Sequence, residues 1–527
     1  MRLGTFPNRP SPGPARAAEQ AGPGEAGTGR PDPVAWLIAL AAFAAYTTLS
    51  VFRYLRLAPG SWDLGIYTQY VRQIAHLHAP VVTIRGAGFN LLGDHFQPIV
   101  ALVAPFYRLF PSPVTLLVAQ ALLTAVSVVP VCRAARVLLG TGVSRAIGGA
   151  YGFSWGLQQM IIFDFHEIAF AVPLLACSLS ALVRRRPRAA AAWALPLVFV
   201  KEDQGLTVAA IGLVMIAAAV RARAEREQDG AAGSAAPSAT ALASPGDASP
   251  WAGAGALLVC WGLAWSALAI AVIIPHFNPA HHYVYWSDGG VLGPHGHLSA
   301  GGLLSQLARG GPEKLRTTAL VLLPVAFLAL RSPLASVAVP GLALRFLATN
   351  SNFWGTQWHY DATLMPIVFV AAIDGLARIQ AHAAQRSRRR GARAPGYAAA
   401  AMALVAVVLA FRFPVAQLWQ PRTYQISAHV RAERAAIAVV PPGTTVESTL
   451  TMLAPLATRD STFWIGTPGN PVPRYIVYDA ASTGYTHPPT DILGFLDQRY
   501  PGVTYQTIFH EHRVYVFRRI TNGPRLN

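Results

Sequence analysis

Long apolar runs alternate along the chain with short polar stretches, many of which carry arginine. A run of about 20 apolar residues is long enough to cross a bilayer as a helix. The pattern predicts spans at 34–52, 113–131, 146–162, 168–183, 189–200, 206–220, 251–275, 317–330, 333–347, 362–377 and 397–411. The shorter apolar run at 97–110 is followed by prolines, and we expect it to be re-entrant or interfacial. The fold class predicted is an α-helical integral membrane protein with about 11 transmembrane helices.

The stretches between the spans divide the membrane part in two. Residues 1–32 are rich in proline, glycine, alanine and arginine, which predicts a disordered cytoplasmic tail. Residues 221–250 are charged and then rich in alanine, serine and glycine, as in a flexible cytoplasmic linker. We therefore expect one membrane region at 33–220, with outer-loop motifs, and a second at 251–412.

The pattern changes after residue 412. His429–Val440 has helical spacing, Thr445–Ser448 and Tyr475–Tyr478 have the pattern of short strands, and Val503–Phe517 has that of a hairpin. Residues 413–527 are therefore predicted to form a small α/β domain.

The arginines predict the orientation of the spans. Arg2, Arg9, Arg16 and Arg30 precede the first span, and cytoplasmic loops carry an excess of Lys and Arg. The N-terminus is therefore expected in the cytoplasm, and the C-terminal domain is expected to be extracytoplasmic. The predicted location is the cell membrane, with multiple passes.

Composition agrees with a membrane protein and excludes a soluble one. Of the 527 residues, 53% are hydrophobic and 13% are charged, whereas soluble domains are about 25% charged. The net charge of +18 is typical of nucleic-acid binders. Here the arginines lie in short loops between spans, so membrane lipids and not nucleic acid are the expected partners. The three cysteines lie in apolar runs and are expected to be small core residues.

Four polar motifs fall on the predicted outer side of the membrane. Acidic residues at a membrane edge are costly, and they are most often functional. The motifs contain Asp63, the Asp94-His95 pair, the set Asp164, His166 and Glu167, and the run Lys201-Glu202-Asp203. We expect these residues to converge on one site near the outer membrane boundary.

The same motifs resemble those of one bacterial family. They read Asp-Leu-Gly-Ile-Tyr, Asp-His-Phe-x-Pro, Phe-His-Glu-x-Ala-Phe-x-Val-Pro and Lys-Glu-Asp-x-Gly. Together they resemble a family of polytopic membrane proteins whose function is unknown, over roughly residues 34–520. More distantly, the layout is similar to C-type glycosyltransferases, with an acidic residue after span one and a C-terminal outer domain. Those enzymes transfer a sugar from a polyprenyl-phosphate carrier to an acceptor outside the membrane.

This resemblance implies a membrane glycosyltransferase with Asp63 as its catalytic residue. A carboxylate can accept the proton of the acceptor hydroxyl while the sugar–phosphate bond breaks. The donor would be a polyprenyl-phosphate-linked sugar, and the extracytoplasmic acceptor is unknown. The alternative for Asp63 is a helix N-cap, a position that aspartate favours.

The other polar residues are candidates for substrate binding. The set is Asp94, His95, Asp164, His166, Glu167, Lys201, Glu202, Asp203, Arg345, Gln357, His359 and Tyr360. Lys201 could hold the carrier phosphate, or it could neutralise the two acids that follow it. Arg345 could hold a phosphate bidentately.

Some of these residues also fit other chemistry. Asp94, His95, Asp164, His166 and Glu167 have side chains that suit a divalent metal ion, although their spacing matches no defined metal motif. The alternative for the second acidic set is a hydrogen-bonded turn between two spans. No certain cofactor is predicted.

Two other functions remain open at this stage. A transporter or flippase for lipid-linked sugars would carry charged residues midway through its spans, together with paired repeats. A non-catalytic membrane protein of cell-envelope assembly would tolerate replacement of the outer acids.

Overall fold

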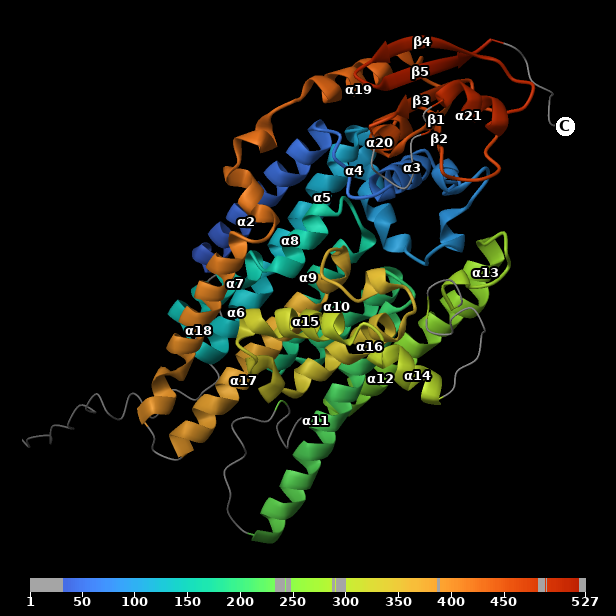
Figure 1. The fold of residues 1–527 in the computed structure, drawn as a ribbon. Helices are drawn as coiled ribbons and strands as arrows, with labels where there is room; N and C mark the ends of the chain where they lie inside the picture. The colour runs from blue at the N-terminus through green and yellow to red at the C-terminus, as the bar shows by residue number, and fades with distance from the viewer. Residues whose placement is uncertain are drawn as a thin grey trace, which may run out of the picture.

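The computed structural model describes residues 32–232, 242, 248–286, 290, 300–385, 389–481, 489 and 491–520. The predicted tail, except Asp32, and the middle of the predicted linker lie outside these residues. Figure 1 shows a long helical body with a small sheet at one end.

Helices make up most of the chain. In the first membrane region they are α2 (Pro33–Leu55), α3 (Asp63–Ala75), α4 (Ala104–Leu109), α5 (Pro113–Val126), α6 (Val128–Leu139), α7 (Thr141–Gly152), α8 (Trp155–Ile162), α9 (Ala171–Val183), α10 (Pro187–Ala194) and α11 (Gln204–Ala232). They continue with α12 (Ala248–Leu268), α13 (Ile274–Phe277), α14 (Ala300–Ala308), α15 (Gly311–Leu322), α16 (Val339–Leu347), α17 (Leu364–Gln385) and α18 (Arg389–Ala410). The last are α19 (Ala428–Val439), α20 (Leu453–Ala457) and α21 (Ile492–Arg499).

Several helical segments are long and apolar enough to cross a membrane, so the chain is a multi-pass membrane protein. Within the described residues there are five: Pro33–Leu55, Pro113–Leu139, Gln204–Glu227, Ala248–Phe277 and His359–Ala384. Four shorter apolar helices accompany them, at Pro98–Leu109, Glu167–Val183, Pro333–Leu347 and Ala394–Ala410. The total of eleven spans therefore stays a prediction.

Not every predicted span is a single helix: the run 146–162 is divided between α7, which ends at Gly152, and α8, which begins at Trp155. The run 317–330 is not a single helix, because α15 ends at Leu322 and two short 3-10 turns follow. Ala326 and Phe327 have φ values of 47° and 60°, a left-handed conformation that no α-helix contains. High hydropathy identified the run as apolar but could not show this break.

The cysteines are unbonded, and their environments differ. Cys132 is buried as expected and Cys177 is partly buried, but Cys260 is exposed on α12. The expectation of a core position is therefore wrong for Cys260.

Small residues allow α11 and α12 to pack closely. A side chain at Gly212 would place its Cβ 2.5 Å from the carbonyl oxygen of Gly255, so the two backbones meet directly. Such contacts are typical of membrane helix pairs, where small residues let backbones approach.

The C-terminal part forms a five-stranded sheet in the order β2-β1-β3-β5-β4. Its strands are β1 (Thr445–Ser448), β2 (Ser461–Trp464), β3 (Tyr475–Asp479), β4 (Tyr505–Glu511) and β5 (Val514–Arg519). β1 pairs in parallel with β2 and β3, and β5 runs antiparallel to both β3 and β4. The predicted strands and hairpin coincide with β1, β3 and the β4–β5 pair, whereas β2 was not predicted.

The sheet shares its core with the membrane helices. Ile476, Tyr478 and Phe517 belong to the same buried cluster as the residues of α2 and α3, while β5 also packs against α19. A second buried cluster consists of C-terminal residues together with Leu57, so the C-terminal part has some core of its own and shares the rest. The boundary of a C-terminal domain at residue 413 stays a prediction.

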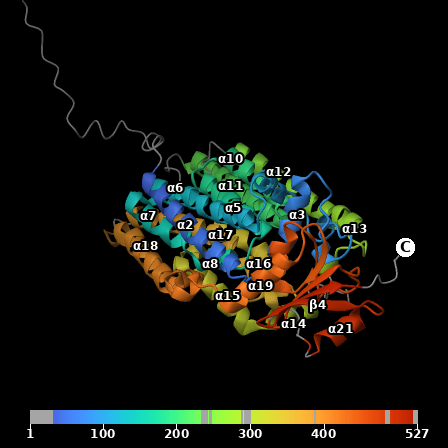
Figure 2. The ribbon, with the colours of Figure 1, turned by 90° about the horizontal axis from the view of Figure 1, so that it is seen from above.

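The sheet sits over the beginning of α3. A Cβ at Gly65 would lie 3.3 Å from the Cβ of Leu453, so α20 rests directly on α3. In Figure 1 the sheet and α3 lie at one end of the molecule, and the C-terminal end of α11 lies at the other. Figure 2 shows the sheet beside the helical body when seen from above. These two parts, which were predicted on opposite sides of the membrane, are thus at opposite ends, and which end is cytoplasmic stays a prediction.

Candidate functional site

Asp63 is the first residue of α3 and does not cap the helix. The capping position belongs to Trp62, and no side chain caps it. The Ser61 hydroxyl donates a hydrogen bond to Oδ2 of Asp63 and accepts one from its backbone N–H at 3.0 Å. The N-cap interpretation of Asp63 is therefore wrong. Its Oδ1 accepts no hydrogen bond from the residues that the structure describes, and the side chain is half-buried.

Tyr67 lies one turn further along α3 and connects this helix to the second acidic motif. Its hydroxyl donates to Oε2 of Glu167 and lies 2.9 Å from Oε1 of Gln97. Glu167 is fully buried, with His166 Nδ1 at 2.5 Å and Lys201 Nζ at 3.3 Å from its carboxylate. We call Asp63, Tyr67, His166, Glu167 and Lys201 the Asp63 cluster.

Burial and neighbouring charges together shift the pKa values of Asp63 and Lys201. Burial raises the pKa of Asp63, and the charges of His166 and Lys201 with the Ser61 hydrogen bond act against that rise. Burial opposes the charge of Lys201, but the neighbouring carboxylates, Glu167 foremost, outweigh burial and raise the pKa of its ammonium group. Asp63 is thus a more basic carboxylate than usual, and the charge of Lys201 acts on it.

Asp164 ties the two motifs together through the backbone. Its Oδ2 accepts hydrogen bonds from the N–H groups of Gly60 at 2.7 Å and Ser61 at 3.2 Å. Gln120 donates to its carbonyl oxygen at 2.5 Å, and the φ of Asp164 is 77°. Burial raises the pKa of Asp164 to about 7, against the opposing charge of Arg53 and the two N–H bonds. Asp164 therefore holds the loop that presents Asp63, as the hydrogen-bonded-turn interpretation of its motif expected.

Glu202 organises a second group of polar residues. Its Oε1 is 2.7 Å from Nδ1 of His95 and accepts from Tyr283 at 2.9 Å, and its Oε2 accepts from the N–H of Phe96 at 3.1 Å. Burial disfavours the charged carboxylate, but His95 outweighs burial and lowers the pKa of Glu202. Both oxygens are occupied, so Glu202 fixes the His95 loop. Lys201 forms its ion pair with Glu167, so the mutual pairing expected within Lys201-Glu202-Asp203 is wrong.

Asp94 is held by residues from two different loops. Its Oδ1 accepts from Arg85 at 2.9 Å and from the Tyr285 hydroxyl at 2.8 Å. The Arg85 guanidinium also lies 5.6 Å from the ring centre of Trp62, the residue before Asp63. Asp203, in contrast, is half-exposed, and among the described residues its side chain accepts one hydrogen bond, from the neighbouring Gln204 at 3.3 Å.

The loop before α17 brings His359 to the cluster. Its ring stacks on His166 with centroids 3.6 Å apart, and both of its nitrogens are buried without a hydrogen-bond partner among the described residues. Tyr360 lies beside it, with ring centroids 4.3 Å apart. Buried polar atoms without partners are rare in proteins, so His359 is a candidate for contact with a polar ligand.

Arg345 fastens this loop and is not free to bind a phosphate. It donates to Asp361 at 2.8 Å, to the Phe353 carbonyl at 2.9 Å and to the Gly355 carbonyl at 3.0 Å. A phosphate would have to displace Asp361 from the same face of the guanidinium. The geometry therefore argues against the role that the sequence suggested for Arg345.

The metal site considered for the first two loops does not assemble. Asp94 pairs with Arg85, His95 pairs with Glu202, and Asp164 accepts from backbone N–H groups. These side chains point to separate partners instead of one point, and His166 and Glu167 pair with each other. Within the described residues, the one group with the spacing of a metal site lies elsewhere, in the C-terminal part.

A large open cavity lies apart from the Asp63 cluster. Its volume is about 1220 Å³, and its lining includes four arginines, Arg56, Arg316, Arg412 and Arg422. We call it the arginine cavity. Gln357 lines it, and two residues later His359 stacks on His166, so one loop connects the cavity with the cluster.

Sequence reasoning missed several of these residues. Tyr67 and Gln97 were not among the candidates, although Tyr67 follows Asp63 by four residues and must share its helix face. The cavity arginines could also have been identified from the sequence. They lie on the predicted outer side, where the positive-inside rule disfavours arginine.

Comparisons with known proteins agree with a membrane fold of this kind. A family model described as Predicted membrane protein (DUF2079) matches residues 53–468. No curated protein matches the chain by sequence.

Solved structures give the fold. ArnT from Cupriavidus metallidurans in the apo state is 14% identical with a TM-score of 0.51, over 91% of this chain and 97% of that chain. The same protein bound to undecaprenyl phosphate is 12% identical with a TM-score of 0.47, over 92% and 99%. The oligosaccharyltransferase AglB from Archaeoglobus fulgidus, in complex with an inhibitory peptide and a dolichol-phosphate, is 12% identical with a TM-score of 0.37, over 84% and 69%. The similarity to C-type glycosyltransferases expected from the layout is confirmed for the overall fold.

Proposed function

The chain belongs to the DUF2079 family of predicted membrane proteins, and we propose that it is a glycosyltransferase that uses a polyprenyl-phosphate-linked sugar. The acceptor is an extracytoplasmic molecule. The observation that carries the proposal is the state of Asp63: a half-exposed carboxylate with a raised pKa, influenced by the charge of Lys201, whose Oδ1 has no hydrogen-bond partner among the described residues. The fold shared with ArnT, a protein crystallised with undecaprenyl phosphate, supports the same class of donor.

The chemistry assigns one task to each of these two groups. The bond from the sugar C1 to the carrier phosphate oxygen breaks, and a bond from C1 to the acceptor oxygen forms. Oδ1 of Asp63 takes the proton of the acceptor hydroxyl, and a raised pKa makes it a better base near neutral pH. Lys201 stays charged and offsets the negative charge that returns to the carrier phosphate.

The surrounding residues keep this pair in place. Glu167 holds Lys201 at 3.3 Å, and Tyr67 links Glu167 to the helix that begins with Asp63. His359 brings to the same place two buried ring nitrogens without a hydrogen-bond partner among the described residues, and sugar hydroxyls can satisfy them.

Under this proposal the arginine cavity binds the acceptor molecule. Its volume of about 1220 Å³ exceeds the 300–1,000 Å³ usual for small-molecule pockets. A large anionic acceptor fits both its size and its arginines. The loop from Gln357 to His359 then connects the acceptor with the reacting centre.

Replacement of Asp63 by asparagine tests the proposal. Asparagine keeps the size of the side chain and its hydrogen bond from Ser61 but cannot take a proton, and loss of a general base costs about 10²–10⁴-fold in rate. Purified protein would be supplied with a panel of polyprenyl-phosphate sugars and envelope extract, and release of free polyprenyl phosphate would be followed by mass spectrometry.

The matched control is Asp497→Asn, an exposed aspartate on α21 far from any proposed role. It should keep full activity, and both variants should be as abundant as the wild type. Undiminished transfer by Asp63→Asn would end the assignment of Asp63 as the base. It would favour a non-catalytic role in envelope assembly.

A further inference from the structure

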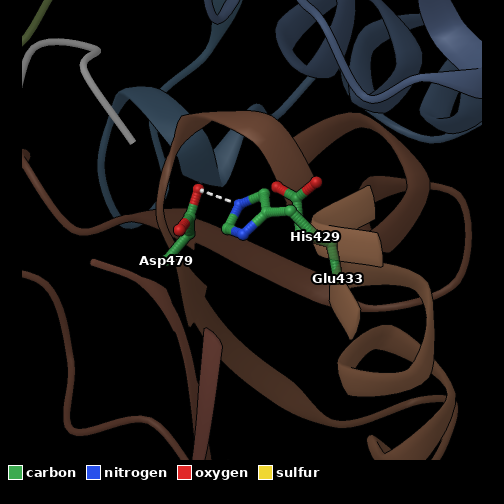
Figure 3. A group of neighbouring side chains, drawn as sticks. All are labelled: His429, Glu433 and Asp479. Atoms are coloured by element: carbon green, nitrogen blue, oxygen red, sulfur yellow. Dashed lines mark ion pairs between the residues drawn. The ribbon is translucent and has the colours of Figure 1, made fainter. Parts of the chain in front are cut away.

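Three side chains in the C-terminal part converge outside the site described above. His429 and Glu433 lie four residues apart on α19, so they occupy one face of the helix. Asp479 is the last residue of β3, the central strand of the sheet. Figure 3 shows the three side chains turned towards one another. One ligand atom from each lies within 4.8 Å of the other two.

The histidine is oriented as a metal-bound histidine usually is. Its Nδ1 lies 2.9 Å from the carbonyl oxygen of His512, in the turn between β4 and β5, so Nδ1 carries the proton. That leaves Nε2 as the ligand atom. It lies 3.2 Å from Oδ2 of Asp479, with which it pairs when no ion lies between them. Most metal-binding histidines donate their other ring N–H in this way, which fixes both tautomer and ring orientation.

The two carboxylates are buried, and in the described part of the chain the ion pair that they form is the one between Asp479 and His429. Glu433 is 1% exposed and Asp479 is 2% exposed. Among the described residues, no lysine or arginine forms an ion pair with either, and Oε1 of Glu433 has no hydrogen-bond partner at all. Buried carboxylates normally pair with cations or coordinate metals, so this arrangement calls for a cation.

We propose that His429, Glu433 and Asp479 bind a divalent transition-metal ion. One imidazole and two carboxylates without cysteine suit zinc or manganese, and three protein ligands leave a position for water. His429 is about one-third exposed, which gives the ion a path from solvent.

The ion would fasten three elements at one point: α19, the central strand β3 and, through the carbonyl of His512, the β4–β5 turn. α19 also reaches the membrane part, because Arg434 donates to the carbonyl oxygen of Leu55 at the end of α2. The site therefore stabilises the outer part of the molecule, separately from the Asp63 cluster.

Zinc content and affinity of the full-length protein test this proposal. The protein is purified without a polyhistidine tag, stripped with a chelator and titrated with zinc chloride by calorimetry. The wild type should bind one equivalent, and zinc should raise its melting temperature. Glu433→Gln should lower the affinity more than about 100-fold, because loss of a group that only supports a metal ligand already costs 10–100-fold.

Two neighbouring variants serve as matched controls. His510→Gln and Glu511→Gln change exposed residues of β4 and should bind zinc as the wild type does. If Glu433→Gln fails to fold, His429→Gln replaces a partly exposed ligand and should show the same loss. X-ray absorption of the wild-type zinc complex should show one imidazole with oxygen ligands. Absence of stoichiometric binding, or equal binding by every variant, would overturn the site.

Discussion

The Asp63 cluster and the arginine cavity are both polar, but they differ in how closely their charged side chains pair with opposite charges. In and around the cluster two buried glutamates have a cation at close range: Lys201 lies 3.3 Å from Glu167, and His95 lies 2.7 Å from Glu202. In the cavity, Arg316 has a carboxylate at the looser distance of 3.9 Å, from Glu313. The other three cavity arginines pair with no carboxylate in the described part of the chain.

This difference assigns the two regions different tasks: the cluster fixes the reacting groups, and the cavity binds an anionic substrate. Paired buried charges hold a fixed geometry, which a reacting centre needs, and they cannot easily recruit another ion. Unpaired arginines on an open wall draw in anions and hold them by charge. We therefore expect changes in the cluster to lower the rate or the binding of the donor, and changes in the cavity to weaken a second anionic substrate.

The larger effect is expected from Lys201→Ala. A hydrogen bond to a charged group is worth about 1.5–3 kcal/mol, so loss of contact with the carrier phosphate should raise the KM for the donor by roughly 10- to 100-fold. Initial rates at a series of donor concentrations measure it. Lys201→Arg keeps the charge beside Glu167 and should recover a substantial part of the binding.

Protein abundance distinguishes this role from a structural one. A lysine needed only to neutralise Glu167 would leave a buried charge unpaired when removed, and little folded protein would accumulate. Normal KM in the folded fraction together with low abundance would assign Lys201 to stability alone.

A smaller effect is expected from Arg412→Glu in the cavity. Exposed ion pairs contribute about 0.2–1 kcal/mol, so reversing one exposed charge should raise the half-saturating amount of envelope extract on the order of fivefold. The KM for the donor should not change. Arg518→Glu, which reverses an exposed charge on β5, should leave both quantities as in the wild type.

The outcome also decides which substrate occupies the cavity. A rise in the KM for the donor instead would assign the cavity to the polyprenyl phosphate. Unchanged values for both substrates would remove the cavity from the reaction, and the contrast with the cluster would then carry no functional meaning.

Hydropathy predicted the membrane class and most apolar helices because burial in lipid leaves a direct mark on the sequence. It could not predict the break after Leu322, where the chain stays apolar but leaves helical geometry at Ala326 and Phe327. Strand β2 was missed although β1 has the same length of four residues and was predicted, so a pattern this short does not identify strands reliably. Patterns report the average environment of a segment and not the conformation of single residues.

The sequence likewise predicted part of the candidate site and not the rest. The acids at the membrane edge were identifiable because an unpaired charge there is costly. Which acid is fixed and which is free depends on contacts between distant segments, such as Asp164 with Gly60 or His95 with Glu202. Arg345 illustrates the limit: an arginine at the end of a span suggested phosphate binding, but in three dimensions its donors are used by its own loop.

The most direct measurement is a structure of the wild-type protein in lipid with a polyprenyl-phosphate sugar bound. The account predicts the donor phosphate within hydrogen-bond distance of Lys201 Nζ, about 2.7–3.2 Å. It also predicts the C1 face of the sugar turned towards Oδ1 of Asp63. A donor whose sugar lies in the arginine cavity, with Asp63 in contact with solvent alone, would contradict the assignment of the reacting centre.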